Sequence, residues 1–130
     1  MATKLFVNIP VKDLKRSEQF FKGLGFEFFG MTPDMASVII SEHTQVMLIA
    51  EPTFGAFARN GVADATQSTE AILVLGVETR EQVDSLLAKA LAAGGTPAGV
   101  PQQGSGRYQR GFADPDGHHW EVLTLEQPAG

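Results

Sequence analysis

The same order of predicted elements occurs twice along this chain, with one strand, one helix and three further strands in each half. Apolar spacing predicts the first set at residues 5–11, 14–24, 26–31, 36–41 and 45–50. It predicts the second set at residues 71–77, 79–93, 96–100, 107–113 and 118–125. Val11 aligns with Val77 in the opening strands, and Met47 aligns with Glu121 in the closing strands. An internal repeat of this kind constrains the fold more strongly than any local propensity.

A single βαβββ module would form a curled sheet with an uncovered concave face, which a second module can close. The predicted fold is therefore α+β, with two tandem βαβββ modules forming an open eight-stranded barrel-like mixed sheet and helices outside. The length of 130 residues suits one domain, 1–130. Within it we expect module one at 1–50, a connector at 51–69 and module two at 70–126.

Composition excludes several classes of partner and chemistry. The net charge of -5 provides no broad basic surface for nucleic acid, so none is expected as a partner. No apolar run approaches the roughly 20 residues that cross a bilayer, and no signal-peptide core is visible, so we expect a cytoplasmic protein without membrane contact. Cysteine is absent, which excludes disulfides, a thiolate nucleophile and cysteine metal ligands.

A tight turn near the C-terminal end leads into a strand that carries an acidic side chain. The turn is predicted at Asp114-Pro115-Asp116-Gly117, because Pro fixes φ, Asp bonds nearby amides and Gly tolerates positive φ. Side chains alternate along the strand that follows, so His119, Glu121 and Leu123 share one face. The other face carries Trp120 and Val122, which we expect to pack under a helix.

Both ends of the chain resemble one known family. Residues 7–14, 20–21 and 24–26 resemble the opening of the vicinal oxygen chelate superfamily, which includes glyoxalase I, bleomycin-resistance proteins and extradiol dioxygenases. Residues 112–118 together with Glu121 resemble its closing motif. The resemblance implies the fold. It says less about the reaction, because this fold hosts isomerases, dioxygenases, thiol transferases and drug binders.

Metal-dependent members of this superfamily hold the ion with His, Glu or Gln from the opening and closing strands of both modules. The resemblance places the four positions at Phe6, Met47, Ile72 and Glu121. Only Glu121 offers a donor atom that a hard metal prefers, so we expect no metal there and no cofactor. A displaced metal site is the less favoured alternative. It would draw on Asn8, Gln45, Glu51, Gln109 and His119.

The residues expected to face the ligand follow from strand parity and from the repeat. They are Phe6, Asn8, Gln45, Met47, Ile72, Val74, Arg107, Gln109, His119 and Glu121. Glu121 in an apolar cavity is a candidate general base or ligand anchor. The alternative is a structural carboxylate paired with Arg107, Arg110 or Gln45. Parity also puts Arg107 on the Glu121 side, where it would either clamp a ligand carboxylate or phosphate or remain solvated.

One binding function and two enzymatic functions remain. We favour a protein that binds or sequesters a small, largely apolar molecule in the barrel cavity. One alternative is a metal-independent lyase or isomerase in which Glu121 removes a proton next to a carbonyl and Arg107 or Gln45 steadies the oxyanion. The other is a metal-dependent glyoxalase or dioxygenase with the displaced site. A homodimer is expected, with Phe54 and Phe57 of the connector either at the subunit interface or forming a lid.

Overall fold

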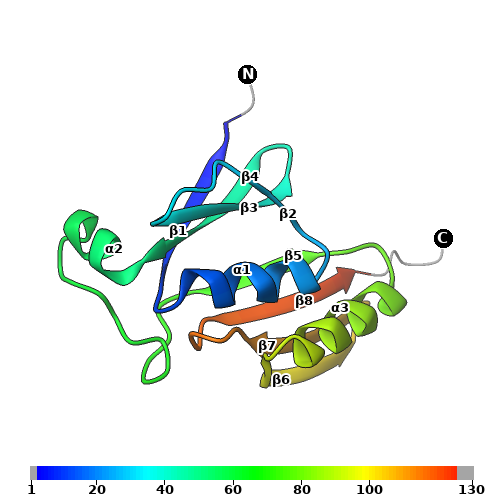
Figure 1. Cartoon of the computed structure of the whole chain (residues 1–130). Coiled ribbons are helices and arrows are strands. Elements are labelled where there is room, and N and C mark those ends of the chain that lie inside the picture. The colour runs from blue at the N-terminus through cyan, green and yellow to red at the C-terminus, as the bar shows by residue number, and fades with distance from the viewer. Residues whose placement is uncertain (1–2, 126–130) are drawn as a thin grey trace. The chain divides into compact units, whose positions relative to one another are not determined.

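The computed structural model describes residues 3–125, which divide between Ala63 and Asp64 into two units, each built on its own four-stranded sheet (Figure 1). Each unit contains one strand, one helix and three further strands in that order. The predicted α+β class of two tandem βαβββ modules is confirmed. Among these residues no helix has the length and apolar character needed to cross a membrane.

The first unit has the strand order β1-β4-β3-β2, in which β1 runs parallel to β4 and the other neighbours are antiparallel. Its elements are β1 (Leu5–Val11), α1 (Leu14–Gly23), β2 (Glu27–Phe29), β3 (Met35–Ser41), β4 (Thr44–Ala50) and α2 (Glu51–Phe57). Asp13 caps α1 by accepting from the Arg16 amide, and α1 packs on β3 and β4. Phe20 and Phe21 of α1 are fully buried, so they anchor the helix to the sheet.

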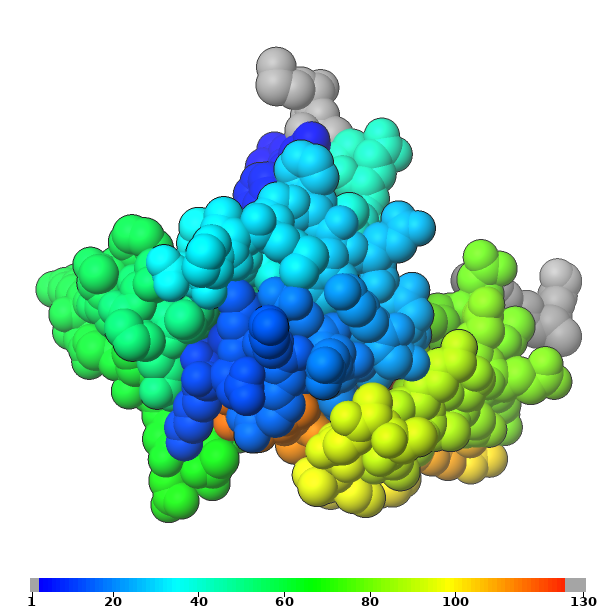
Figure 2. Space-filling view, in the orientation of Figure 1, coloured from blue at the N-terminus to red at the C-terminus, as the bar shows by residue number. Residues whose placement is uncertain are grey.

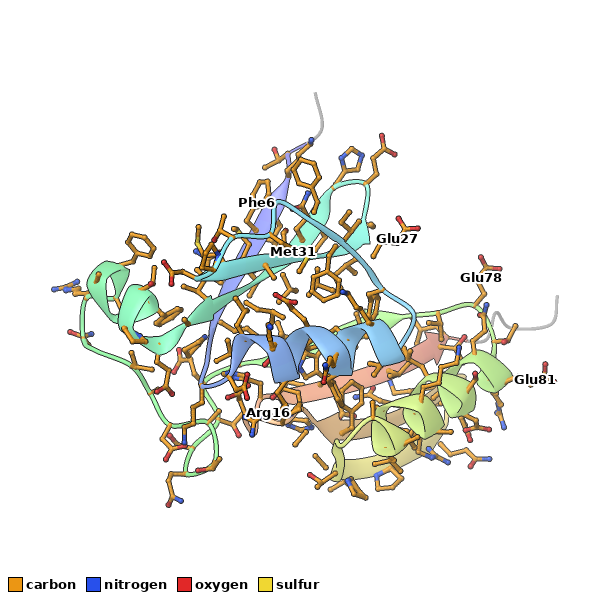
Figure 3. All side chains as sticks on the ribbon, in the orientation of Figure 1. Phe6, Arg16, Glu27, Met31, Glu78 and Glu81 are labelled. Atoms are coloured by element: carbon orange, nitrogen blue, oxygen red, sulfur yellow. The ribbon has the colours of Figure 1, made fainter. Side chains whose placement is uncertain are left out.

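The second unit repeats this order in the sheet β5-β8-β7-β6, with β5 parallel to β8. Its elements are β5 (Ile72–Gly76), α3 (Arg80–Ala92), β6 (Thr96–Gly104), β7 (Arg107–Ala113) and β8 (His119–Leu125). Thr79 and Gln82 form the predicted capping box at the start of α3. Glu78 and Glu81 project into solvent at this end (Figure 3), where negative charge suits the helix dipole. The outer side of α3 lies on the surface, yellow-green in Figure 2.

The predicted strand at 26–31 is shorter in the structure, where β2 covers only Glu27–Phe29. Two other elements differ more from the sequence prediction. The predicted connector at 51–69 begins with the helix α2, because Pro52 in the first turn and Glu51 beside it suit a helix start despite the Gly at position 55. The predicted strand at 96–100 continues to Gly104 after a register shift. Pro97 is tolerated because β6 is an edge strand. The hairpin turn at Ser105-Gly106 has positive φ at both positions, as a type I′ turn requires.

The strand registers confirm the predicted alignment of the two halves. In the first sheet β1 pairs with β4 so that Asn8 faces Met47, and in the second β5 pairs with β8 so that Val74 faces Glu121. When Val11 is aligned with Val77, Asn8 of the first half is equivalent to Val74 of the second. In the closing strands, Met47 is equivalent to Glu121. The two modules therefore share one register, which places corresponding residues at equivalent points of each sheet.

The core of the second unit fixes β8 against α3 and the preceding turn. Trp120 is fully buried, and its ring stacks on Phe112 with centroids 6.2 Å apart. The indole Nε1 donates to Asp114 Oδ2 at 3.0 Å, while the amides of Asp116 and His118 donate to Asp114 Oδ1. Burial raises the pKa of Asp114 above its ordinary value of 3.8, although these donors and His118 lower it in part. One carboxylate thus joins the turn to the core.

We expect Asp114 to make stability depend on pH in the acidic range. Because its folded pKa is raised, the folded state binds this proton more tightly than the unfolded chain does. The resulting stabilisation is fully present below pH 3.8 and is lost as the pH rises through the folded pKa. Asp114→Asn removes this titration, so its free energy of unfolding should fall less over that range than that of the unmodified protein. Urea denaturation at a series of pH values measures both curves.

The exposed Asp34→Asn serves as the matched control, because it removes a carboxylate that is not buried. Asp114→Asn should also be less stable overall, since the new amide group meets the Trp120 N–H, which is itself a donor. Parallel pH curves for the unmodified protein and Asp114→Asn would contradict the predicted role of this carboxylate.

Candidate functional site

The acidic side chain of Glu121 lies on the face of the second sheet opposite α3. Trp120 and Val122, its neighbours on β8, are fully buried on the helix side, as parity predicted. Strand pairing places Val74 of β5 on one side of Glu121 and Gly111 of β7 on the other. We call this side of the sheet the Glu121 face. It carries Ile72, Val74, Arg107, Gln109, Gly111, His119, Glu121, Leu123 and Leu125.

Both oxygens of the Glu121 carboxylate have partners from the same sheet. Gln109 Nε2 donates to Oε1 at 3.0 Å, and His119 Nε2 lies 2.5 Å from Oε2. Glu121 is only 4% exposed, so these two contacts compensate for the water that the carboxylate loses. We call these three residues, His119, Glu121 and Gln109, the Glu121 cluster. It joins a carboxylate to an imidazole at hydrogen-bond distance, which is an arrangement able to accept and pass on a proton.

The alternative interpretation, in which Arg107 or Arg110 pairs with Glu121, is wrong for the described residues. Arg110 lies on the helix side, where its guanidinium donates to the carbonyl oxygens of Gln102 and Gln109 and stacks on the Tyr108 ring at 4.1 Å. Arg107 is on the Glu121 face but pairs with Leu125, four residues along β7 from Gly111. The carboxylate is held instead by the closer side chains of Gln109 and His119.

Two glycines make room for the buried carboxylate. A Cβ atom at Gly111 would overlap the Glu121 carboxylate and would lie 2.5 Å from the Ala98 carbonyl oxygen. Gly99 has φ of +75°, and a Cβ there would also overlap the carboxylate and approach His119 Nε2 to 3.0 Å. Neither glycine has a role that was predicted from the sequence. The role of Gly111 could have been predicted only from the register of β7 and β8, which places this glycine directly opposite Glu121.

Apolar side chains border the Glu121 cluster. Val74 and Ile72 of β5 are 50% and 51% exposed. These side chains and the partly exposed Leu123 surround a polar group recessed in the sheet. Such a combination of apolar surface and a few placed polar atoms is typical of small-molecule sites.

The remaining predicted site residues belong to the first unit. Phe6, Asn8, Gln45 and Met47 share one face of the first sheet, because Phe6 pairs with Gln45 and Asn8 pairs with Met47. Phe6 is half-exposed on β1 (Figure 3). Ser37 Oγ donates to Gln45 Oε1 at 2.5 Å, a contact that was not predicted from the sequence. By the repeat, Met47 occupies the place of Glu121 and Gln45 that of His119.

The donor atoms at the four positions named by the family resemblance do not fit a divalent metal ion. Phe6 and Ile72 have hydrocarbon side chains and Met47 offers a thioether, so one carboxylate remains. Over residues 3–125, no three His, Asp or Glu side chains lie close enough together to hold a metal ion.

We expect Gly111→Ala to disrupt the Glu121 cluster. The added methyl group meets both the Glu121 carboxylate and the backbone of Ala98, so β6 or the carboxylate must move. The free energy of unfolding should fall by about 1–3 kcal/mol. Gly76→Ala is the matched control on β5, because a Cβ there has nothing within 4 Å, and its stability should stay the same or rise by up to about 1 kcal/mol. Equal stability of the two variants in urea denaturation would contradict the close packing at Gly111.

Comparisons with known proteins place this geometry in a family. The model of the Glyoxalase/Bleomycin resistance protein/Dioxygenase superfamily matches residues 5–122. A hypothetical protein from S. aureus is 34% identical with a TM-score of 0.81, covering 96% of this chain and 95% of that one. No curated protein matches the chain.

More distant solved structures share the fold. An antibiotic binding protein from Streptomyces sp. CB03234 is 18% identical with a TM-score of 0.70, covering 97% of this chain and 98% of that one. A lactoylglutathione lyase from Agrobacterium tumefaciens is 17% identical with a TM-score of 0.72, covering 95% and 94%. With its two βαβββ modules and a family match over residues 5–122, the chain belongs to the Glyoxalase/Bleomycin resistance protein/Dioxygenase superfamily.

Proposed function

We propose that this protein binds a small, largely apolar molecule on the Glu121 face. The observation that carries the proposal is the buried Glu121 carboxylate, held by Gln109 and His119 and bordered by the half-exposed Val74 and Ile72. Two exposed aliphatic side chains beside a recessed polar group favour a ligand with an apolar body and one hydrogen-bond donor. The similarity in fold to an antibiotic binding protein is in keeping with this function.

The free energy gained by burying aliphatic side chains is large enough to support binding through apolar contact. Completing the burial of side chains such as Val74 and Ile72 gains a substantial part of the roughly 1.5–3 kcal/mol available from each. The Glu121 cluster adds orientation, because its carboxylate accepts a hydrogen bond only from a donor placed beside it. The expected complex is therefore driven by apolar burial and oriented by the carboxylate.

We further propose that binding requires no metal at the four positions of the family pattern. Phe6 and Ile72 lack donor atoms, and both Glu121 oxygens already have protein partners. We also propose a homodimer. Phe57, 69% exposed at the end of α2, supports this part of the proposal, because an aromatic ring left in water favours an apolar contact.

Val74→Ser should weaken the binding of the neutral apolar dye Nile red. The substitution removes hydrocarbon from the edge of the Glu121 cluster, so we expect a loss of about 1 kcal/mol, or a roughly fivefold rise in Kd. Leu91→Ser is the matched control, because Leu91 is an exposed aliphatic side chain on α3, on the other side of this sheet. Fluorescence titration measures both values.

Equal Kd values for Val74→Ser, Leu91→Ser and the unmodified protein would show that the dye binds elsewhere. Native mass spectrometry of protein purified with Zn²⁺, Mn²⁺ and Ni²⁺ supplied tests the other two parts. A metal ion retained by the unmodified protein and lost in Glu121→Gln would contradict metal-free binding, and a monomer mass would contradict the dimer.

A second candidate function is a metal-independent lyase or isomerase. The 2.5 Å contact of His119 Nε2 with Glu121 Oε2 favours it, because a buried carboxylate with an imidazole partner suits a general base. Glu121 would remove a proton from a carbon next to a carbonyl and share it with His119. Arg107 is a poor oxyanion donor for this step, since four residues of β7 separate it from Gly111 by about 13 Å.

Glu121→Gln separates the two candidates. The Gln side chain has the same size and still offers an oxygen to Gln109, so Nile red affinity should stay within about twofold of the original. If Glu121 is a general base, turnover of 2-oxoaldehyde hemithioacetals should fall by about 100-fold or more, because the amide cannot accept the proton. Stopped-flow and steady-state assays measure turnover. Retained turnover on these compounds would exclude the general-base role.

A further inference from the structure

A hollow of about 480 Å³ opens at the hairpin that joins β6 and β7. It is lined by Gln102, Gln103, Gly104, Ser105, Arg107 and Leu125. Strand pairing places Gly104 opposite Arg107 and Gln102 opposite Gln109, so Arg107 and Gln102 lie on the Glu121 face. The hollow therefore lies on the same face of the second sheet as the Glu121 cluster.

We propose that this hollow is a subsite for a carboxylate, and that the ligand of the protein is an elongated amphipathic acid. The inference rests on the proposed binding function and adds the chemical class of the ligand. The carboxylate lies at Arg107, and the apolar body extends over Leu125 and Leu123 toward Val74 and the Glu121 cluster.

The chemistry of the hollow favours an anion. No Asp or Glu occurs among the described residues that line it, whereas Arg107 offers a planar fork of N–H donors that matches a carboxylate. Gln102 adds an amide donor beside it. Within residues 3–125 the Arg107 guanidinium has no hydrogen-bond or ion-pair partner, in contrast to Arg110 on the same strand, which is bound to two carbonyl oxygens and the Tyr108 ring.

Charge selects a carboxylate over a phosphate. The hollow contains one guanidinium among its described residues, and the chain has a net charge of -5. One cation balances a single negative charge, while a phosphate or phosphonate near its second ionisation would bring uncompensated charge to an acidic protein. The subsite is thus expected to prefer a monoanion.

The register sets the approximate length of the ligand. Arg107 lies opposite Leu125, and Gly111 lies opposite Glu121. Four residues of strand separate the two points by about 13 Å. A medium-chain acid such as decanoate spans most of this distance, which places its carboxylate at Arg107 and its methyl end near Val74. Decanoate is thus a probe of the Arg107 end alone, because it lacks the hydrogen-bond donor that the Glu121 carboxylate would accept.

The test compares decanoate with its neutral analogue decanamide by isothermal titration calorimetry. The unmodified protein should bind decanoate at least tenfold more tightly than decanamide. Arg107→Gln should abolish this preference, and Arg107→Lys should retain part of it, because the charge remains but the fork is lost. Lys89→Gln, which removes the same charge from the exposed side of α3, should retain the full preference. Circular dichroism confirms that each variant is folded.

Equal preference in Arg107→Gln and the unmodified protein would overturn the subsite, as would equal binding of the acid and the amide. Tighter binding of decylphosphonate than of decanoate would overturn the choice of a carboxylate. If decanamide and Nile red both depend on Val74 while Arg107 affects neither acid nor amide, the subsite is wrong and the proposed binding function stands. If none of these probes binds, both proposals fail.

Discussion

The hydrogen bond between the Trp120 indole and the Asp114 carboxylate holds Trp120 on the helix side of the sheet. Because side chains alternate along a strand, this bond also sets the face on which each remaining side chain of β8 lies. Asp114 also accepts from two backbone amides of the turn, so the turn, the start of β8 and the buried ring are held together. A slip of one residue in this strand would place Glu121 on the helix side and Trp120 on the other. The orientation of the site therefore depends on an interaction located on the opposite face of the sheet.

The two modules share a backbone register but carry different chemistry at equivalent points. In the second sheet Gly111 lies opposite Glu121, and in the first Ser37 lies opposite Met47. Gly111 leaves space that the carboxylate fills, whereas Ser37 bonds to Gln45 and leaves Met47 as an apolar neighbour. The repeated βαβββ module thus sets the positions of side chains in each sheet, and the residue type at each position decides whether that position is polar or apolar.

Patterns of local chemistry predicted most of the elements. Period-two alternation identified β8 and the side occupied by Glu121, and the Thr79–Gln82 capping box marked the start of α3. The prediction missed α2, because its glycine and proline resemble a loop unless the preceding strand is seen to lead directly into the helix. It also ended β6 too early, since an irregular register shift hides the continuation of the strand to Gly104.

Sequence alone therefore determined the repeat, the family and the single acidic side chain among the four positions of the family pattern, because these depend on residue type and spacing along the chain. The partners of Glu121 were decided only by tertiary structure. The sequence offered Arg107, Arg110 or Gln45 as partners for a structural carboxylate, yet the register of β7 and β8 brings Gln109 and His119 to Glu121. Which side chain reaches a buried charge is set by pairing between distant strands, and charge alone does not reveal that pairing.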